Sequence, residues 1–285
     1  MEFLIQLLNS IQYGLLLFLL ASGLTLVFGI MGVINMAHGS FYMIGAYLAY
    51  WLTSKIGNFW LAIPLGLAIV ILLGVVIEGV LFRRLYRRDH LQQVLLTFGL
   101  ILIFEELRSI LFGDEVQGVA VPAILNNSIP LTDNLSYPVY RLFISFTCLL
   151  IAGAMYWLIQ KTRLGMMIRA GSSNRRMVQS LGININRIYS LVFAVGLALA
   201  AFAGMIAAPV SSVYPGMGNQ ILIICFVVVV IGGIGSIKGA LVAALMIGIT
   251  DTLSKVFLPD FSGFAVYLLM AIILLWRPQG LFKGV

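Results

Sequence analysis

Long apolar stretches separated by short polar segments run along almost the whole chain. A helix needs about 20 mostly apolar residues to cross the hydrocarbon of a bilayer. By that measure we expect spans near residues 8–30, 33–53, 59–82, 94–112, 139–160, 187–213, 220–234, 238–257 and 261–276. The pattern predicts an all-α, polytopic membrane helical bundle of eight or nine spans, because a glycine-broken stretch can either cross the bilayer or turn back.

Two of the apolar stretches are interrupted by glycine and polar residues. The first is GIMGVINMAHGSFYMIG at residues 29–45, and the second lies in IGGIGSIKGALVAALMIGI at residues 231–249. Irregular backbone survives at membrane depth only where it is buried in protein or lines a water-filled cavity. Interrupted spans in both halves of a transporter point to its pathway. We therefore expect a translocation path bordered by Asn35, His38, Gly39, Ser40, Gly232, Gly233 and Gly235.

The composition leaves no room for a separate soluble domain. Hydrophobic residues make up 61% of the 285 residues and charged residues 9%, against roughly 25% charged residues in an average soluble domain. We expect residues 1–285 to form a single transmembrane domain. The chain has no Walker A pattern, and its two histidines have no acid cluster beside them, so we expect no ATPase site, no metal site and no other enzymatic activity.

Basic residues are concentrated in certain loops. Residues 161–187 contain six basic residues and no acid, and residues 83–93 contain four arginines, Arg83, Arg84, Arg87 and Arg88. Because basic loops stay in the cytoplasm, we place both loops there, together with the C-terminus, which carries Arg277 and Lys283. The loop 113–138 has no basic residue and faces outward with Asp114, Glu115 and Asp133. The net charge of +7 thus reflects topology and lipid attraction, not nucleic-acid binding, which would need interleaved aromatic residues.

The basic loop 161–187 contains signals for a short helix. Ser172 and Ser173 can cap its N-terminus, and Gly182 suits the left-handed position after its end. Between them we expect Met177, Val178 and Leu181 to share one apolar face. Such a helix either docks into a groove of a soluble partner or lies on the membrane surface.

A few ionisable side chains fall within the predicted spans, where charges are costly and are functional candidates by default. Glu105 and Arg108 can pair at i, i+3 with Glu106 beside them, and Asp251 has Lys255 one turn further along. Pairing that stabilises the helices is the interpretation we favour for both groups. For His38 we favour one fixed hydrogen bond that secures the helix break over a proton relay.

Small residues recur at helical spacing in the stretch 187–213. They are Ala198, Ala201, Gly204 and Ala208. Because small side chains let transmembrane helices approach closely, this stripe predicts a helix contact instead of a solute site.

Four segments in order resemble the permease of branched-chain amino acid ABC transporters, specifically the H-type of its two permease subunits. The segments are GLTLVFGIMGVINMAHGSFYMIGAY at 23–47, TRLGMMIRAGSSNRRMVQSLGININRI at 162–188, IGGIGSIKGALVAALMIGI at 231–249 and RPQGLF at 277–282. Permeases for urea, short amides and aromatic acids look alike over the same motifs, so the motifs leave the solute open.

The resemblance implies a transport subunit of an ATP-driven importer in the bacterial inner (plasma) membrane, without a cofactor. Its expected partners are a second permease subunit in a heterodimer, two ATP-binding subunits, a periplasmic solute-binding protein and a small-molecule substrate. The helix near residues 174–181 would be the coupling helix. The coupling residues would be Arg169, Ser173, Asn174, Arg175, Arg176, Met177, Val178, Leu181 and Gly182. The alternative is a passive channel or secondary transporter for a small polar solute.

Overall fold

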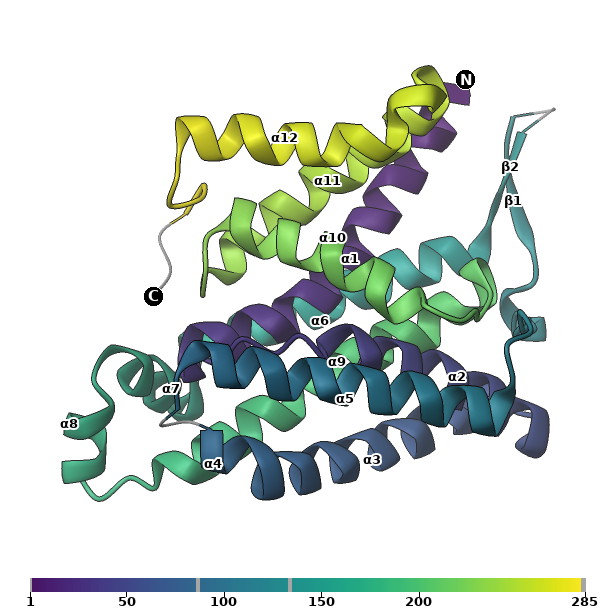
Figure 1. Cartoon of the computed structure of the whole chain (residues 1–285). Helices are drawn as coiled ribbons and strands as arrows, with labels where there is room; N and C mark the ends of the chain where they lie inside the picture. Colours follow the sequence, from purple (N-terminus) through teal and green to yellow (C-terminus); the bar gives the residue numbers. More distant parts are fainter. Residues whose placement is uncertain (1, 86–87, 133–134, 283–285) are drawn as a thin grey trace.

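The computed structural model describes residues 2–85, 88–132 and 135–282, and these residues are almost entirely helical (Figure 1). Arg87, Asp133 and Lys283 lie outside the described residues. The first helices are α1 (Glu2–Met31), α2 (His38–Ile56), α3 (Phe59–Ile77), a π-helical turn (Glu78–Phe82), α4 (Arg83–Leu85), α5 (His90–Phe112) and α6 (Val139–Lys161). They are followed by α7 (Arg163–Ser173), α8 (Arg175–Ser180), α9 (Ile185–Ser211), α10 (Met217–Gly232), α11 (Ile237–Phe257) and α12 (Ser262–Trp276).

Six of the described helical segments are long and apolar enough to cross a membrane. They are Phe3–Met31, Phe59–Phe82, Val139–Lys161, Ile185–Ser211, Ile237–Phe257 and Pro259–Trp276, and Met217–Gly232 is a shorter apolar helix. The chain is therefore a polytopic membrane bundle. The predicted spans 33–53 and 94–112 coincide with α2 and α5, but neither helix belongs to this set of six. Polar residues at the start of α2 and charged residues near the end of α5 lower their apolar character.

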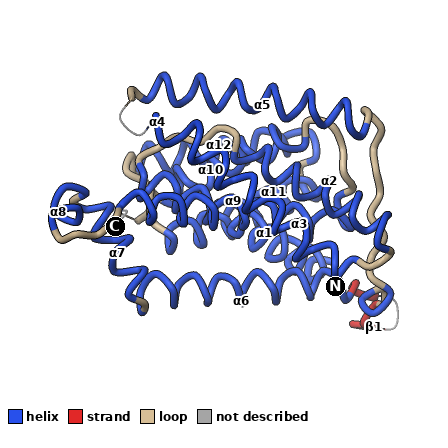
Figure 2. Tube along the Cα trace, turned by 90° about the horizontal axis from the view of Figure 1, so that it is seen from below, coloured by secondary structure: helices blue, strands red, loops and turns tan. Residues whose placement is uncertain are grey.

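The helices run back and forth between two ends of the bundle. The N-terminus and the strands β1 (Ser128–Thr132) and β2 (Leu135–Pro138) lie at one end, which we call the hairpin end (Figure 1). Helices α4 and α8 and the last described residues lie at the opposite end, the α8 end, and the view in Figure 2 agrees.

The antiparallel strands β1 and β2 are a short addition to the predicted all-helical bundle. Their pairing, with Ile129 opposite Tyr137, satisfies backbone groups of a loop that has no helix to supply partners. Gln117 in the same loop exchanges two backbone hydrogen bonds of 2.8 Å with Val213, which follows α9. The loop is thus fastened to the bundle.

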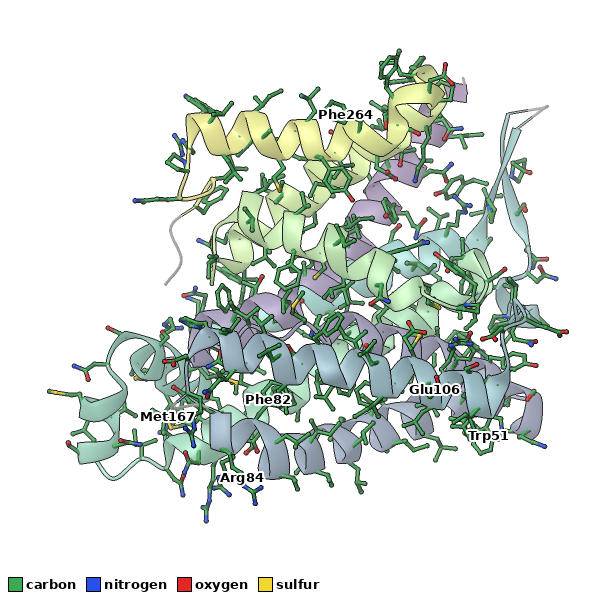
Figure 3. The ribbon with its side chains drawn as sticks, in the orientation of Figure 1. Trp51, Phe82, Arg84, Glu106, Met167 and Phe264 are labelled. Atoms are coloured by element: carbon green, nitrogen blue, oxygen red, sulfur yellow. The ribbon has the colours of Figure 1, made fainter. Side chains whose placement is uncertain are left out.

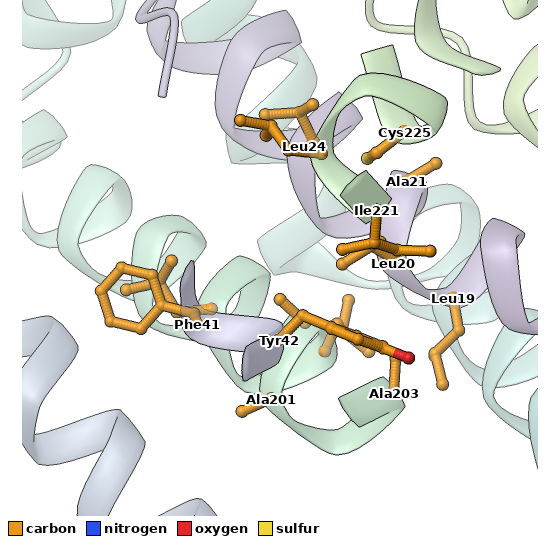
Figure 4. Close-up of a cluster of buried hydrophobic side chains, with 14 of the residues drawn as sticks. Leu19, Leu20, Ala21, Leu24, Phe41, Tyr42, Ala201, Ala203, Ile221 and Cys225 are labelled. Carbon is orange, nitrogen blue, oxygen red and sulfur yellow. The ribbon is translucent and has the colours of Figure 1, made fainter. Parts of the chain in front are cut away.

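Helices α1 and α9 form the centre of the bundle. Helix α1 packs against α6, α9, α10 and α11, and α9 packs against α1, α2 and α3. Figure 4 shows the core where four helices meet, with Leu20 of α1, Phe41 of α2, Ala201 of α9 and Cys225 of α10. Helices α5 and α6 lie along opposite edges (Figure 2) and expose large apolar side chains such as Leu102 and Phe146, as lipid-facing helices do.

Small residues of α9 were predicted to form a helix contact. For Ala201 and Gly204 this prediction is confirmed, because both lie against the backbone of α2. A Cβ atom on Gly45 of α2 would overlap the carbonyl oxygen of Ala201, and a Cβ on Gly204 would overlap that of Tyr42. The backbones of α2 and α9 therefore approach more closely than any larger side chain permits. Ala208 is also fully buried, whereas Ala198 is only partly buried and faces α3 beside Leu67.

We expect Gly45→Ala to lower the thermal unfolding midpoint of the purified protein in detergent. The added methyl group collides with backbone that cannot move aside, and overpacking of this kind costs about 1–3 kcal/mol. Gly153→Ala in α6 is the matched control, because its methyl group meets nothing within 4 Å and alanine favours a helix over glycine. Equal midpoints for the two variants would contradict this account of the α2–α9 contact.

Candidate functional site

The basic loop forms two helices at the α8 end. The Thr162 hydroxyl accepts a 3.1 Å hydrogen bond from the Gly165 amide at the start of α7. Asn174 then caps α8, with its side-chain oxygen 3.0 Å from the Met177 amide. The prediction of Ser172 and Ser173 as the N-terminal cap is wrong, because both residues complete the last turn of α7. The extended backbone of Asn174 separates the two helices.

Helix α8 presents a pair of exposed apolar side chains. Gly182 adopts the left-handed conformation after the helix (φ 80°), as predicted. Val178 is buried, whereas Met177 is 64% and Leu181 is 72% exposed. The apolar face predicted for these three residues is therefore divided, since Val178 holds α8 to the protein and the other two point outward. The side chains of Arg175 and Arg176 lie outside the described part of the structure.

The second glycine interruption separates α10 from α11. Gly233 and Gly235 both have positive φ, 95° and 81°, and the Ser236 hydroxyl caps α11 by accepting a 3.1 Å hydrogen bond from the Gly239 amide. The C-terminal segment folds back over this break, where the Leu281 amide donates to the carbonyl of Ile231 at 2.8 Å. Sequence reasoning treated RPQGLF only as a motif and missed this contact.

The first glycine interruption lies between α1 and α2, and its polar side chains are buried although Gly32 is exposed. Asn35 and His38 are completely buried, and Ser40 is 3% exposed. The Asn35 side-chain oxygen accepts from the Ala37 amide at 3.1 Å. His38 Nε2 lies 3.0 Å from the Leu20 carbonyl of α1, which is the fixed hydrogen bond that we expected. Gly39 lies directly against the backbone of Gly218 in α10.

Helix α1 connects the two interruptions. A Cβ atom on Gly29 would lie 2.5 Å from the Cα atom of Gly235, so the end of α1 touches the second break. Gly235, Gly29 and Arg169 also line one cavity of about 260 Å³ at the α8 end. The Arg169 guanidinium donates to the Ile159 carbonyl of α6 across this cavity. The structure therefore brings one predicted coupling residue beside one predicted path residue.

The other predicted path residues do not line this cavity. Asn35, His38, Gly39, Ser40, Gly232 and Gly233 are packed inside the bundle or under the C-terminal segment. Asn35 Nδ2 and His38 Nδ1 are nonetheless buried without a hydrogen-bond partner among the described residues. Buried polar atoms rarely lack a partner in folded proteins, so these two atoms mark a place that suits a water or a polar solute.

The charges within the helices are paired as expected. Arg108 lies 3.4 Å from Glu105 and 2.8 Å from Asp114, and Lys255 lies 2.6 Å from Asp251. The guanidinium of Arg108 holds the pKa of the exposed Asp114 carboxyl below its usual range. Glu106 lies toward the hairpin end, and Arg84 toward the α8 end (Figure 3).

One buried acid was missed by sequence reasoning. Glu78 is 2% exposed and accepts a 2.5 Å hydrogen bond from Ser190 of α9. It begins the π-helical turn at the end of α3, a distortion that is frequent at functional sites. The one sequence signal that could have identified Glu78 as a candidate is its position as an acid inside the apolar stretch 59–82.

These features together define a class of protein: a multi-pass membrane permease without an ATPase site, whose buried helix breaks are connected to a helical loop at one end. The chain matches the family described as "Branched-chain amino acid transport system / permease component" over residues 6–275, and it belongs to that family.

Curated relatives agree with this assignment. The chain is 30% identical to the high-affinity branched-chain amino acid transport system permease protein LivH of Escherichia coli K12, over 98% of this chain and 95% of the relative. It is equally similar, with the same coverage, to the corresponding protein BraD of Pseudomonas aeruginosa. The LivM permease protein of Escherichia coli K12 is 27% identical over 92% of this chain and 67% of its own length. No solved structure matches the chain significantly.

We expect Gly29→Ala to reduce solute uptake strongly while the protein still reaches the membrane. The new methyl group would displace the break at Gly235. Gly29 lies in the last turn of α1, so we expect the rest of the bundle to stay folded and the loss to appear in transport activity. Gly99→Ala in α5 is the control, since nothing lies within 4 Å of its added methyl group. Uptake by cells with equal amounts of both variants measures the effect, and equal uptake would argue against the Gly29 contact.

Proposed function

We propose that this chain forms the solute pathway of an ATP-driven importer for branched-chain or related aliphatic amino acids, and that the whole chain acts as one permease domain. The match to the branched-chain permease family over residues 6–275 carries this proposal. The LivH and BraD relatives, by their names, transport branched-chain amino acids. Helix α7 packs against α1, and Gly29 of α1 touches Gly235, so these contacts support a mechanical connection between the loop and the pathway.

We infer nine crossings, formed by α1, α2, α3, α5, α6, α9, α10, α11 and α12. The α8 end would be cytoplasmic, because Arg84, Arg163 and Arg187 lie in its loops or beside them, and the hairpin end would face the periplasm. The N-terminus would then lie outside, a point that sequence reasoning left open. Helix α2 begins inside the bundle at His38, so it crosses the bilayer together with the preceding extended segment.

The proposed partners follow from the exposed part of α8 and from the relatives. Met177 and Leu181 offer an apolar pair on a cytoplasmic helix, which suits a groove on each ATP-binding subunit. The likeness to LivM as well as LivH supports a related second permease subunit. A periplasmic solute-binding protein would deliver the solute at the hairpin end.

The proposed mechanism is alternating access without covalent chemistry. ATP binding would draw the two ATP-binding subunits together and move α8 and α7, which Arg169 ties to α6. The movement would pass from α7 to α1, against which it packs, and α1 would transmit it to the Gly233–Ser236 break through Gly29. The unpartnered polar atoms of Asn35 and His38 would then be exposed to the solute as the first break opens.

A passive channel or secondary transporter is the alternative. Such a protein would also need broken helices, but it would have no use for an exposed apolar pair on α8. It would support uptake when expressed without ATP-binding subunits. Full uptake by the isolated chain in vesicles without nucleotide would favour this alternative.

We expect Leu181→Asp and Met177→Asp to uncouple ATP hydrolysis from uptake without loss of protein from the membrane. Both side chains are exposed, so folding is unaffected, whereas a carboxylate in an apolar docking groove costs about 2 kcal/mol or more. Uptake and ATPase activity of the assembled transporter would be measured together. Gln92→Asp, an exposed polar residue at the same end, is the control, and normal coupling in the α8 variants would contradict the docking role.

The orientation predicts which introduced cysteines react from outside. An impermeant thiol reagent added to intact cells with a permeable outer membrane should label Phe3→Cys and Ile124→Cys but not Met177→Cys. All three positions are more than half exposed, and the native Cys148 and Cys225 are buried. Labelling of Met177→Cys in intact cells, or labelling of Phe3→Cys only after lysis, would contradict the proposed topology.

A further inference from the structure

A second cavity opens near the hairpin end, and none of the predicted path residues lines it. Its volume is about 440 Å³, within the range of about 300–1,000 Å³ typical of small-molecule sites. Helices α1, α2, α6, α9, α10 and α11 all contribute to its walls. Its residues come from both halves of the sequence, so no local motif reveals it.

One wall carries a positive charge without a carboxylate partner. Arg141, in the first turn of α6, donates a 2.6 Å hydrogen bond to the side-chain oxygen of Asn9 in α1. Among the described residues, Arg108 and Lys255 are ion-paired near this end, but no ion pair of Arg141 is found. An arginine facing a cavity with only neutral partners is suited to a carboxylate, which it binds through parallel hydrogen bonds.

Another part of the wall carries a negative charge that can change its partner. Asp251 of α11 is 9% exposed and accepts a 2.6 Å hydrogen bond from Lys255. The Lys255 side chain is 60% exposed, so it can turn toward water when another cation takes its place beside the nearly buried Asp251 carboxylate. The Asp251 carboxylate can then receive an ammonium group from a ligand.

The rest of the cavity wall combines polar side chains, such as Gln6, Gln12 and Thr252, with aliphatic ones. Leu16, Ile144 and Ile221 line it from α1, α6 and α10, and the side chain of Tyr42 reaches it from α2. Tyr42 follows His38 by one helical turn, so the cavity ends near the first helix break. A cation, an anion and an aliphatic wall thus surround one space.

From this arrangement we infer that this cavity near the hairpin end, which we call the outer cavity, binds an aliphatic α-amino acid as its zwitterion. Arg141 contacts the carboxylate, Asp251 contacts the ammonium group, and Leu16, Ile144 and Ile221 contact the side chain. This inference rests on the proposed function and adds to it a site at which the permease itself recognises the solute after release from the binding protein.

Protection of an introduced cysteine tests the site. Ser211 of α9 lines the cavity and is exposed, so Ser211→Cys in the assembled, detergent-solubilised transporter should react with iodoacetamide. L-Leucine should slow this reaction. 3-Methylbutylamine lacks the carboxylate and 4-methylpentanoate lacks the ammonium group, and each should protect with about tenfold weaker apparent affinity, the effect of losing one charged hydrogen bond. Lys55→Cys, exposed at the same end outside the cavity, is the control and should not be protected.

Variants of Arg141 in the Ser211→Cys background assign the carboxylate contact. Arg141→Gln should weaken protection by leucine about tenfold, as loss of the carboxylate does, and Arg141→Lys should restore part of it because the charge returns. In Arg141→Gln, leucine and 3-methylbutylamine should become equivalent, which a merely structural role of Arg141 would not produce. Reaction of Ser211→Cys at the parent rate without ligand shows that the variant is folded.

The outcomes separate this inference from the proposed function. Normal leucine uptake by the transporter without protection of Ser211→Cys would overturn the inference alone. Equal protection by leucine and by either analogue would also overturn it, because one of the two charge contacts would be absent. Failure of the unmodified transporter to import leucine would overturn the proposed solute, and this inference with it.

Discussion

Backbone amides and carbonyls have no water to bind inside a bilayer, and this constraint governs the whole structure. Each of the two helix interruptions leaves such groups free at a depth where they must be satisfied by protein. The first break is satisfied in part locally, because the Gly32 amide donates to the Phe28 carbonyl and the Ala37 amide donates to the Asn35 side-chain oxygen. The C-terminal segment adds hydrogen bonds to the carbonyls of Ile231 and Gly232. Close contacts at glycine, Gly39 against Gly218 and Gly29 against Gly235, let neighbouring segments pack beside both breaks.

The same close contacts connect parts of the chain that are distant in sequence. Helix α1 touches the second break with its end, and the first break with the carbonyl of Leu20. Since interiors are packed densely, a shift in one contact is transmitted to the next. Arg169 of α7 lines the same cavity as Gly235, and α7 packs against α1. The helical loop therefore lies at one end of this series of contacts. This is the arrangement that a permease needs if a separate ATPase is to move its pathway.

Charge is distributed differently at the two ends of the bundle. At the α8 end the basic residues lie mainly in the short helices α4, α7 and α8 and at the adjoining ends of α6 and α9. At the hairpin end Arg141, Asp251 and Lys255 face a cavity between helices. Charges in such a place are expensive unless they are paired or useful. In this cavity Arg141 has a neutral partner, Asn9, whereas Asp251 is paired with Lys255. This arrangement differs from a purely structural ion pair, in which both charges neutralise each other.

The sequence by itself determined the helical bundle, the positions of both glycine interruptions, the left-handed Gly182 and the ion pairs at i, i+3 and i, i+4. These depend on apolar length, on backbone freedom and on neighbours along one helix, and all three are local properties. Tertiary structure alone decided that Asn174 and not Ser173 caps α8, that Val178 turns inward, that β1 and β2 pair, and that Arg141 meets Asn9. Each of these outcomes depends on which distant segment occupies the space beside a residue, and that information is absent from the local pattern because competing local arrangements differ too little in energy.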